Sequence, residues 1–183
     1  MNSQNSLAYD VQNPFKRLTI QIISPGEFTE PMKIALQANN KQNFQDRLHY
    51  NFCEHVDECL SWMKKNGNSP DYIAIVVDPR NKSCIELAED NIKKLDPTFI
   101  SGGRLSLVNG ACSIKPRDMG VGLGHINVLA QKYSVILING DVMIPDKCHI
   151  MATRISGLAT GVCGFHTGIP VSVDVPGYDE MFQ

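Results

Sequence analysis

The feature that most constrains the fold is residues 72–77, Tyr-Ile-Ala-Ile-Val-Val, an apolar run that contains no charged or amide side chain. Strands of this composition are typical of parallel sheets, because helices cover both faces of such a sheet. Asp78 and Pro79 follow at once and end the run. The sequence therefore predicts a strand at the centre of a sheet that lies between two layers of helices.

Segments with strand and helix patterns alternate along the rest of the chain. We expect strands at residues 18–24, 47–52, 72–77, 104–108 and 135–139, and helices at residues 31–40, 56–65, 83–95, 123–133 and 145–158. Ser83 and Glu86 form a capping box at the start of the third helix, and residues 47–52 alternate as half-exposed or edge strands do. This order predicts an α/β fold with a mostly parallel sheet of about five to six strands, sandwiched by helices and joined by right-handed crossovers.

We expect a single domain over residues 16–163, preceded by a disordered leader over residues 1–15. From residue 164 the chain changes character. Ile169, Val171 and Val173 alternate with prolines and polar residues, which predicts an extended C-terminal tail over residues 164–183. Prolines restrict such a segment to the edge of a sheet. The tail either docks on its own domain or is covered by a partner, and the sequence leaves both alternatives open.

The first strand and the helix after it have the frame of a phosphate-binding loop without its chemistry. If Gly26 is the first glycine of G-x-x-x-x-G-K-[ST], the second glycine, the lysine and the hydroxyl residue become Pro31, Met32 and Lys33. Proline removes an amide donor, and methionine cannot bind a phosphate. Glu27 and Glu30 would repel one. The pattern indicates a nucleotide-binding architecture whose phosphate cradle is empty.

The other nucleotide-binding motifs are also degenerate. Asn109 stands where an Asn-Lys-x-Asp motif would read guanine, but the lysine and the aspartate are missing. No Asp-x-x-Gly lies between the second expected strand and residue 72, and Asp78 is better interpreted as a loop cap than as a magnesium ligand. The glycines at 120, 122 and 124 do not match the dinucleotide fingerprint and instead favour the start of a helix.

Composition narrows the remaining functions. A formal net charge of -2 argues against strong nucleic-acid binding. No apolar run approaches the roughly 18–20 residues that span a bilayer, and we expect no secretory signal. The spacing Cys53-x-His55-x3-Cys59, with Cys163 and His166 as remote partners, lacks a C-x2-C pair. We therefore expect reduced core thiols and no metal site.

Several of these segments resemble the centromere protein M family. The resemblance rests on residues 71–77, 83–96, 99 and 103–110, on Cys112-Ser-Ile, on Cys163-Gly-Phe-His166 and on Gly168. It covers about residues 18–173 and is strongest over residues 71–110. The chain departs from the family in its longer Asn/Gln-rich start and in its loop from Gly120 to Gly124. It also lacks the leucine-rich end that the family carries after the position of Val173.

The resemblance implies a small-GTPase-like topology that has lost nucleotide binding and hydrolysis, with no cofactor and no metal. It also implies the role of the family's members, which are non-catalytic structural subunits of the constitutive centromere-associated (inner kinetochore) complex in the nucleus. They support kinetochore assembly and chromosome segregation. They bind the helical-repeat centromere protein I and, through it, centromere proteins H and K. A monomer within a hetero-complex is the implied state.

Apolar side chains on connecting segments mark a candidate partner surface, because a lone domain has little reason to place them there. We expect that surface at Phe99, Ile100, Ile169, Val171 and Val173.

Two other functions stay open. One is a divergent but active nucleotide hydrolase that uses Asp78 and Asn109. The other is an adaptor in membrane traffic, which is disfavoured because no cysteine near the C-terminus offers a lipidation site.

Overall fold

The structure is a computed structural model that describes residues 17–165. Its strands are β1 (Leu18–Ile23), β2 (Leu48–Cys53), β3 (Tyr72–Val77), β4 (Leu105–Asn109) and β5 (Ile136–Asn139). Its α-helices are α1 (Gly26–Asn39), α2 (Val56–Asn66), α3 (Cys84–Lys94), α4 (Thr98–Ser101), α5 (Leu123–Lys132) and α6 (Pro145–Val162). A π-helical turn, η1 (Asn40–Phe44), follows α1, and a 3-10 turn, η2 (Pro116–Asp118), precedes α5.

The strands form one five-stranded sheet in the order β2-β1-β3-β4-β5, and every pair is parallel. The predicted α/β fold is therefore confirmed, and it is consistent with a small-GTPase-like, Rossmann-type topology. β3 lies at the centre of the order and all its residues are buried, as its uniformly apolar sequence predicts. β2 lies at the edge, which its alternating pattern also predicts.

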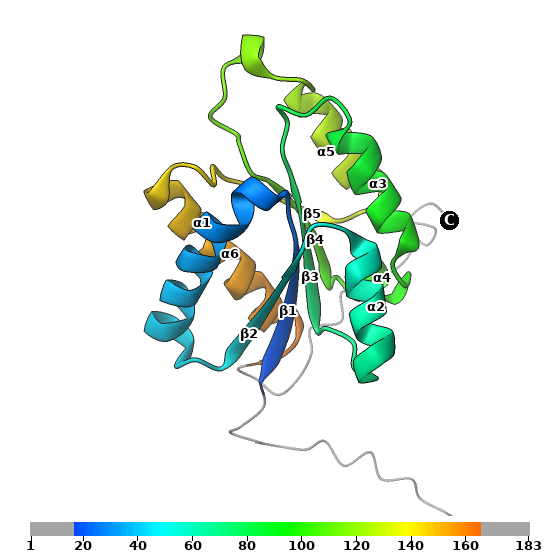
Figure 1. Cartoon of the computed structure of the whole chain (residues 1–183), viewed down its shortest axis with the longest axis vertical. Helices are drawn as coiled ribbons and strands as arrows, with labels where there is room; N and C mark the ends of the chain where they lie inside the picture. Colours follow the sequence, from blue (N-terminus) through cyan, green and yellow to red (C-terminus); the bar gives the residue numbers. More distant parts are fainter. Residues whose placement is uncertain (1–16, 166–183) are drawn as a thin grey trace, which may run out of the picture.

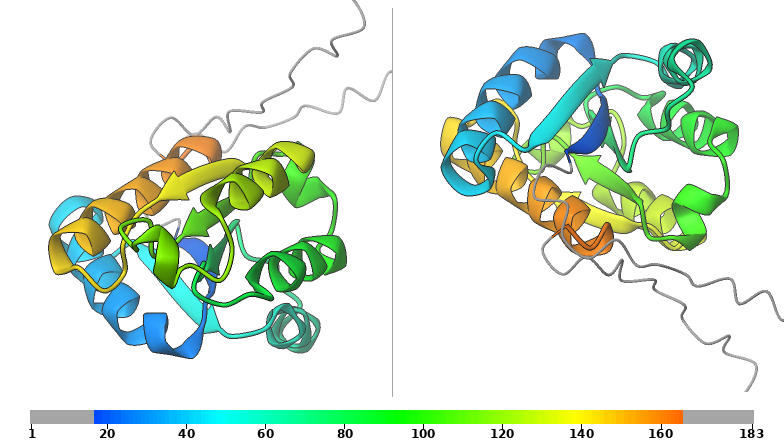
Figure 2. Two further views of the ribbon diagram at one scale, coloured as in Figure 1. Left: turned by 90° about the horizontal axis from the view of Figure 1, so that it is seen from above. Right: turned by 90° about the horizontal axis from the view of Figure 1, so that it is seen from below.

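Two helical layers cover the two faces of the sheet (Figures 1 and 2). α1 and α6 pack together on one face, over a core that includes Leu18, Ile20 and Tyr72. α2, α3, α4 and α5 cover the other face, over a core that includes Ile73 and Ile75. Successive residues of a strand point to opposite faces. The apolar residues of β3 therefore divide between both cores and hold the two layers to one sheet.

Helix α1 begins five residues before the predicted start at Pro31, which lies inside the helix. The preference of proline for a first turn suggested the later start, but the burial of Phe28 decides the boundary. Phe28 is fully buried, and its ring fills the space beside Gly110, where a Cβ would stand 2.8 Å from a ring carbon. Because Pro31 has no N–H, it cannot donate to the carbonyl of Glu27 in the helical pattern.

The start of α3 also differs from the prediction. Ser83 stands at its N-cap, but its side chain makes no capping hydrogen bond, so the predicted capping box does not form. Asn81 supplies the polar contact instead, because its Oδ1 accepts the N–H of Ser83 at 2.9 Å. The link that leads from β3 into α3 is thus a tight turn held by its own side chains.

Candidate functional site

A hollow of about 250 Å³ lies at the carboxyl edge of the sheet, beside the ends of β1 and β3. The strand order reverses here, because β1 leads to β2 on one side and the chain returns to β3 on the other. Ligands of doubly wound α/β proteins bind at this position. The hollow is lined by the β1–α1 link, the β2–α2 link, the end of β3 and one side of α3. This hollow is therefore the candidate nucleotide-binding position of the fold.

Helix α1 begins too close to β1 to leave a phosphate loop between them. Only Ser24 and Pro25 separate the two elements. The N–H of Phe28 already bonds to the carbonyl of Pro25 at 2.9 Å. Gly26 lies against a carboxylate, because a Cβ at Gly26 would stand 2.5 Å from Oε1 of Glu54. The loop frame expected from the sequence is therefore reduced to a short link with an acidic side chain beside it.

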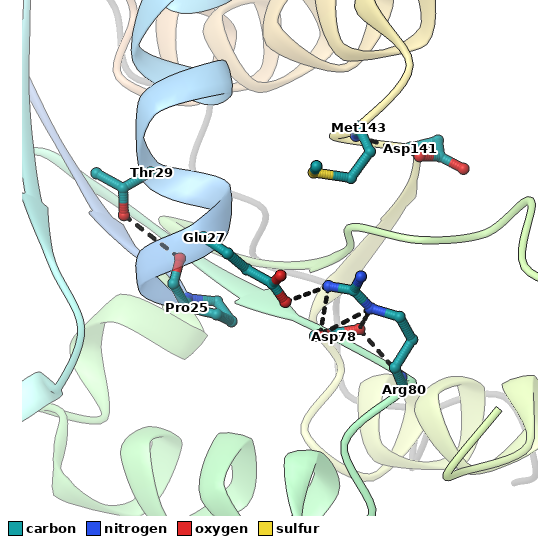
Figure 3. A network of polar contacts seen from close by, with 7 residues as sticks. All are labelled: Pro25, Glu27, Thr29, Asp78, Arg80, Asp141 and Met143. Carbon is teal, nitrogen blue, oxygen red and sulfur yellow. Dashed lines mark hydrogen bonds and ion pairs between the residues drawn. The ribbon is translucent and has the colours of Figure 1, made fainter. Parts of the chain in front are cut away.

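Arg80, in the link between β3 and α3, reaches toward the start of α1 (Figure 3). Its Nε lies 2.8 Å from Oδ1 of Asp78 and its Nη2 lies 2.8 Å from Oδ2, so the guanidinium binds the carboxylate through two nitrogens. Nη2 also donates to Oε1 of Glu27. The guanidinium carbon lies 5.1 Å from the ring centre of Phe28. We call Asp78, Arg80 and Glu27 the Arg80 cluster.

The Arg80 cluster lies at the N-terminus of α1, where this class of fold binds phosphate. The first N–H groups of a helix favour an anion at this end, and Glu27 in the first turn supplies one from the chain itself. Two carboxylates surround one guanidinium, so the cluster is net negative when all three groups are ionised. A phosphate would have to displace Glu27 and overcome this charge.

Electrostatics favour the charged forms of Asp78 and Arg80. Burial alone would raise the pKa of Asp78, but hydrogen bonds from the side chain and main chain of Arg80, together with its positive charge, hold that pKa below its ordinary value. The hydrogen bond to Asp78 is the largest influence on Arg80 and raises its pKa, and the charges of Glu27 and Asp141 act in the same direction. Each partner therefore stabilises the charged form of the other.

Two further contacts hold Arg80 in position. Oδ1 of Asp78 accepts the main-chain N–H of Arg80 at 3.0 Å, which confirms the predicted loop-capping role of Asp78. The loop before α5 packs on the same link, because the N–H groups of Gly120 and Val121 bond to the carbonyl of Pro79 at 2.9 and 3.0 Å. A Cβ at Gly120 would stand 2.4 Å from the carbonyl oxygen of Arg80. Gly120 therefore serves close backbone packing.

Gly122 stands at the N-cap of α5, which confirms the prediction that these glycines mark the start of a helix.

Asn109, the residue left from a guanine-reading motif, is fully buried. Its Oδ1 accepts the N–H of Ala111 at 3.3 Å, and its Nδ2 donates to Oδ1 of Asn139 at 3.2 Å. Both bonds tie the end of β4 to its own turn and to β5. Asp141 closes the turn after β5, because its Oδ1 accepts the N–H of Met143 at 3.2 Å (Figure 3). These polar groups are used in holding the strand ends together.

The residues predicted to contact a partner have different positions. Phe99 is 2% exposed, and the guanidinium of Arg104 lies 4.7 Å from its ring centre. It does not offer the apolar surface expected from the sequence, because the short helix α4 turns its side chain into the core. Ile100 is half-buried against the same core. Ile169, Val171 and Val173 lie outside the described residues.

The predicted core thiols are confirmed for Cys59, Cys84 and Cys148, which are buried. Burial raises the pKa of Cys53, which is half-buried, to about 12, and it raises the pKa of Cys59 and of Cys84 to about 11. Within residues 17–165, no three His, Cys, Asp or Glu side chains gather closely enough to hold a metal ion. No helix in this part of the chain is long and apolar enough to cross a bilayer.

Sequence reasoning missed the role of Arg80. Its signal was its position two residues after Asp78, at the carboxyl end of the central strand, where a loop residue can reach the start of α1. Comparison with known proteins identifies no relative, because no protein-family model and no curated protein matches the sequence.

Proposed function

We propose that this chain is a non-catalytic structural subunit of the inner kinetochore, in the nucleus at the centromere. In this proposal it binds the helical-repeat centromere protein I and, through it, centromere proteins H and K. It acts as a scaffold without enzymatic activity, cofactor or metal, and it supports chromosome segregation. The kinetochore assignment and the partners rest on the resemblance over residues 18–173.

The observation that carries the non-catalytic part of the proposal is the Arg80 cluster. Phosphoryl transfer needs a phosphate cradle, a metal ligand and a positioned water together. Here the start of α1 is occupied by Glu27, and the carboxylate of Asp78 is bound through both oxygens by Arg80. These charged groups are therefore bonded to one another, which favours an architectural role over hydrolysis.

A binding surface for a helical partner is available on the layer formed by α1 and α6. Ile34 on α1 is 61% exposed and Ile150 on α6 is 53% exposed. The two helices lie side by side, because Sγ of Cys148 is 3.7 Å from the carbonyl of Pro31 and Nδ2 of Asn39 is 2.9 Å from Oγ of Ser156. Exposed apolar side chains on paired helices fit a partner that presents helices of its own.

Co-expression of the full chain with centromere protein I tests the assembly. We expect a stable complex on size-exclusion chromatography and its loss in the double variant Ile34→Glu/Ile150→Glu. The matched control is Leu87→Glu/Val128→Glu, which charges two exposed apolar positions on the opposite face, on α3 and α5. Failure of the unmodified chain to bind centromere protein I would reject the proposed partner. Equal loss in both double variants would reject the proposed surface.

A further inference from the structure

The outer edge of β2 presents main-chain groups that the described part of the chain does not pair as a strand. The N–H of Leu18 bonds to the carbonyl of Arg47, and that of Ser24 bonds to the carbonyl of Cys53. Odd-numbered residues of β2 therefore direct their main-chain groups toward β1, and even-numbered residues direct theirs outward. The N–H and C=O groups of Tyr50 and Phe52 accordingly point away from β1, past the outer edge of the sheet.

A side chain already satisfies the first outward position of this edge. The N–H of Leu48 donates to Oδ1 of Asn40 at 3.1 Å, and Nδ2 of Asn40 donates to the carbonyl of Leu48 at 2.8 Å. The asparagine thus makes the two hydrogen bonds that a neighbouring strand would make. Buried main-chain groups need such partners, and Tyr50 and Phe52 are both partly buried in the same strand.

The described chain ends beside this edge. After α6, the ring of Phe165 lies under the guanidinium of Arg47, with 4.8 Å between the guanidinium carbon and the ring centre. Arg47 immediately precedes β2. Three residues, 166–168, can span up to about 10 Å, whereas a new strand lies only about 4.8 Å from its neighbour. Residues from 169 onward can therefore run along β2 from its amino end.

The hand of the crossovers selects the same edge. α1 covers one face and leads from β1 to β2, whereas α2, α3 and α5 cover the other face and lead in the opposite direction along the sheet. These four crossovers share one hand, as parallel connections do. α6 covers the same face of the sheet as α1. A parallel strand that follows α6 therefore keeps this hand only if it lies on the β2 side of β5. The open position there is beyond β2.

The sequence of the tail fits that position. Pro170 and Pro176 are both even-numbered, so a strand with its odd-numbered N–H groups toward β2 places both prolines on the outward side, where no donor is needed. Ile169, Val171, Val173 and Val175 then share one face of the sheet. In a parallel pair, a residue whose main-chain groups bond to the neighbouring strand lies opposite a residue whose groups point away from it. The odd-numbered tail residues would therefore lie opposite odd-numbered residues of β2, so their side chains share the face of His49 and Asn51.

Trp62 is in position to cover those valines. His49 and Asn51 alternate with the β2 residues that pack under α1, so they point to the face that α2 covers. On α2, Asp57 bonds to Lys94 of α3 at 3.0 Å. Helical spacing puts Trp62 about 140° from Asp57, on the flank away from α3. Because α3 lies toward β4, this flank faces the β2 side of the sheet, and Trp62 is only half-buried there.

We propose that residues 169–175 form a sixth parallel strand on the outer edge of β2, with Val171 or Val173 opposite Asn51 and the odd-numbered side chains beneath Trp62. The tail completes the sheet of its own domain. Ile169, Val171 and Val173 then contact this core and are not offered to a partner. The inference is independent of the kinetochore assignment, because it depends only on the sheet and on the tail.

Amide hydrogen exchange of the full chain, measured by NMR, tests the proposal at Tyr50 and Phe52. Truncation after Phe165 should accelerate exchange at both amides at least about tenfold, while Leu48, whose N–H bonds to Asn40, stays unchanged as an internal control. The emission of Trp62, the only tryptophan, should shift to longer wavelength as the valines are removed.

A matched pair of proline variants in the full chain tests the register without truncation. Val173→Pro removes an N–H directed at β2 and should accelerate exchange at Tyr50 and Phe52 as the truncation does. Ser172→Pro removes an outward N–H and should leave exchange within about threefold of the unmodified chain.

Three results would overturn the proposal. The first is equal exchange with and without the tail. The second is equal damage from the two prolines. The third is protection that disappears on dilution, because it would show that a second copy of the chain covers β2.

Discussion

Replacing Arg80 with alanine should destabilise the protein through the carboxylate it leaves behind. The side chain of Asp78 is 10% exposed and that of Arg80 is 35% exposed. Breaking a fully buried ion pair costs roughly 3–5 kcal/mol. One third of Arg80 remains in water, which screens the interaction, so we expect Arg80→Ala to lower the free energy of unfolding by about 2 kcal/mol at pH 7.

The pH dependence of this loss identifies its cause. The folded pKa of Asp78 is depressed, so its stabilising contribution is present above the unfolded pKa near 4 and disappears as the pH falls through the folded pKa. In Arg80→Ala, burial still opposes the charge, and ionised Asp78 becomes destabilising as the pH rises through about 4. The difference between the two proteins should therefore shrink as the pH falls below about 4.

Urea unfolding at pH 7 and pH 3 measures the effect. Adding Asp78→Asn to Arg80→Ala removes the unpaired charge and should recover half or more of the loss at pH 7. Arg117→Ala is the control, because Arg117 is 76% exposed in a weak ion pair with Asp118, and its change should stay within about 0.5 kcal/mol. A loss from Arg80→Ala below about 0.5 kcal/mol, or no recovery from Asp78→Asn, would show that the unpaired carboxylate of Asp78 does not cause the destabilisation.

Two other predictions concern packing and thiol reactivity. Gly120→Ala should cost about 1–3 kcal/mol because its Cβ meets the backbone of the β3–α3 link. Gly124→Ala, with no atom within 4 Å of the new Cβ, should be neutral or stabilising in thermal unfolding; equal effects would contradict the proposed contact. Cys53 and Cys59, whose thiol pKa values are raised to about 12 and about 11, should alkylate more slowly at pH 8 than the partly exposed Cys112. Peptide mass spectrometry gives the order, and faster labelling of Cys53 would count against its buried environment.

The sheet was predictable because its signals are local. Six consecutive apolar residues require cover on both faces, so residues 72–77 predict both a central strand and a parallel sheet. The alternating pattern of β2 predicts a half-exposed or edge strand, because only one of its faces can be fully buried. Helix boundaries were less predictable, because the start of α1 depends on packing between Phe28 and Gly110, which are far apart in the sequence.

For the candidate site, the sequence predicted only which nucleotide-binding residues are missing. Motif spacing shows that lysine, glycine and base-reading residues are missing, because these residues have fixed positions relative to Gly26 and Asn109. What stands in their place depends on a contact between residues 27 and 80, which no periodicity connects. The burial of Phe99 was missed for a similar reason, since a four-residue helix leaves no periodic pattern and its orientation is set by the core below it.

The Arg80 cluster lies at the start of α1, and its Asp78 lines the hollow where this fold would bind a nucleotide, so we expect the chain to bind none. Isothermal titration calorimetry of the full chain with magnesium and GTP measures this binding. We expect no saturable heat up to millimolar nucleotide, and the same result with ATP. Saturable micromolar binding that Asp78→Ala abolishes would contradict this expectation and would favour the nucleotide hydrolase instead.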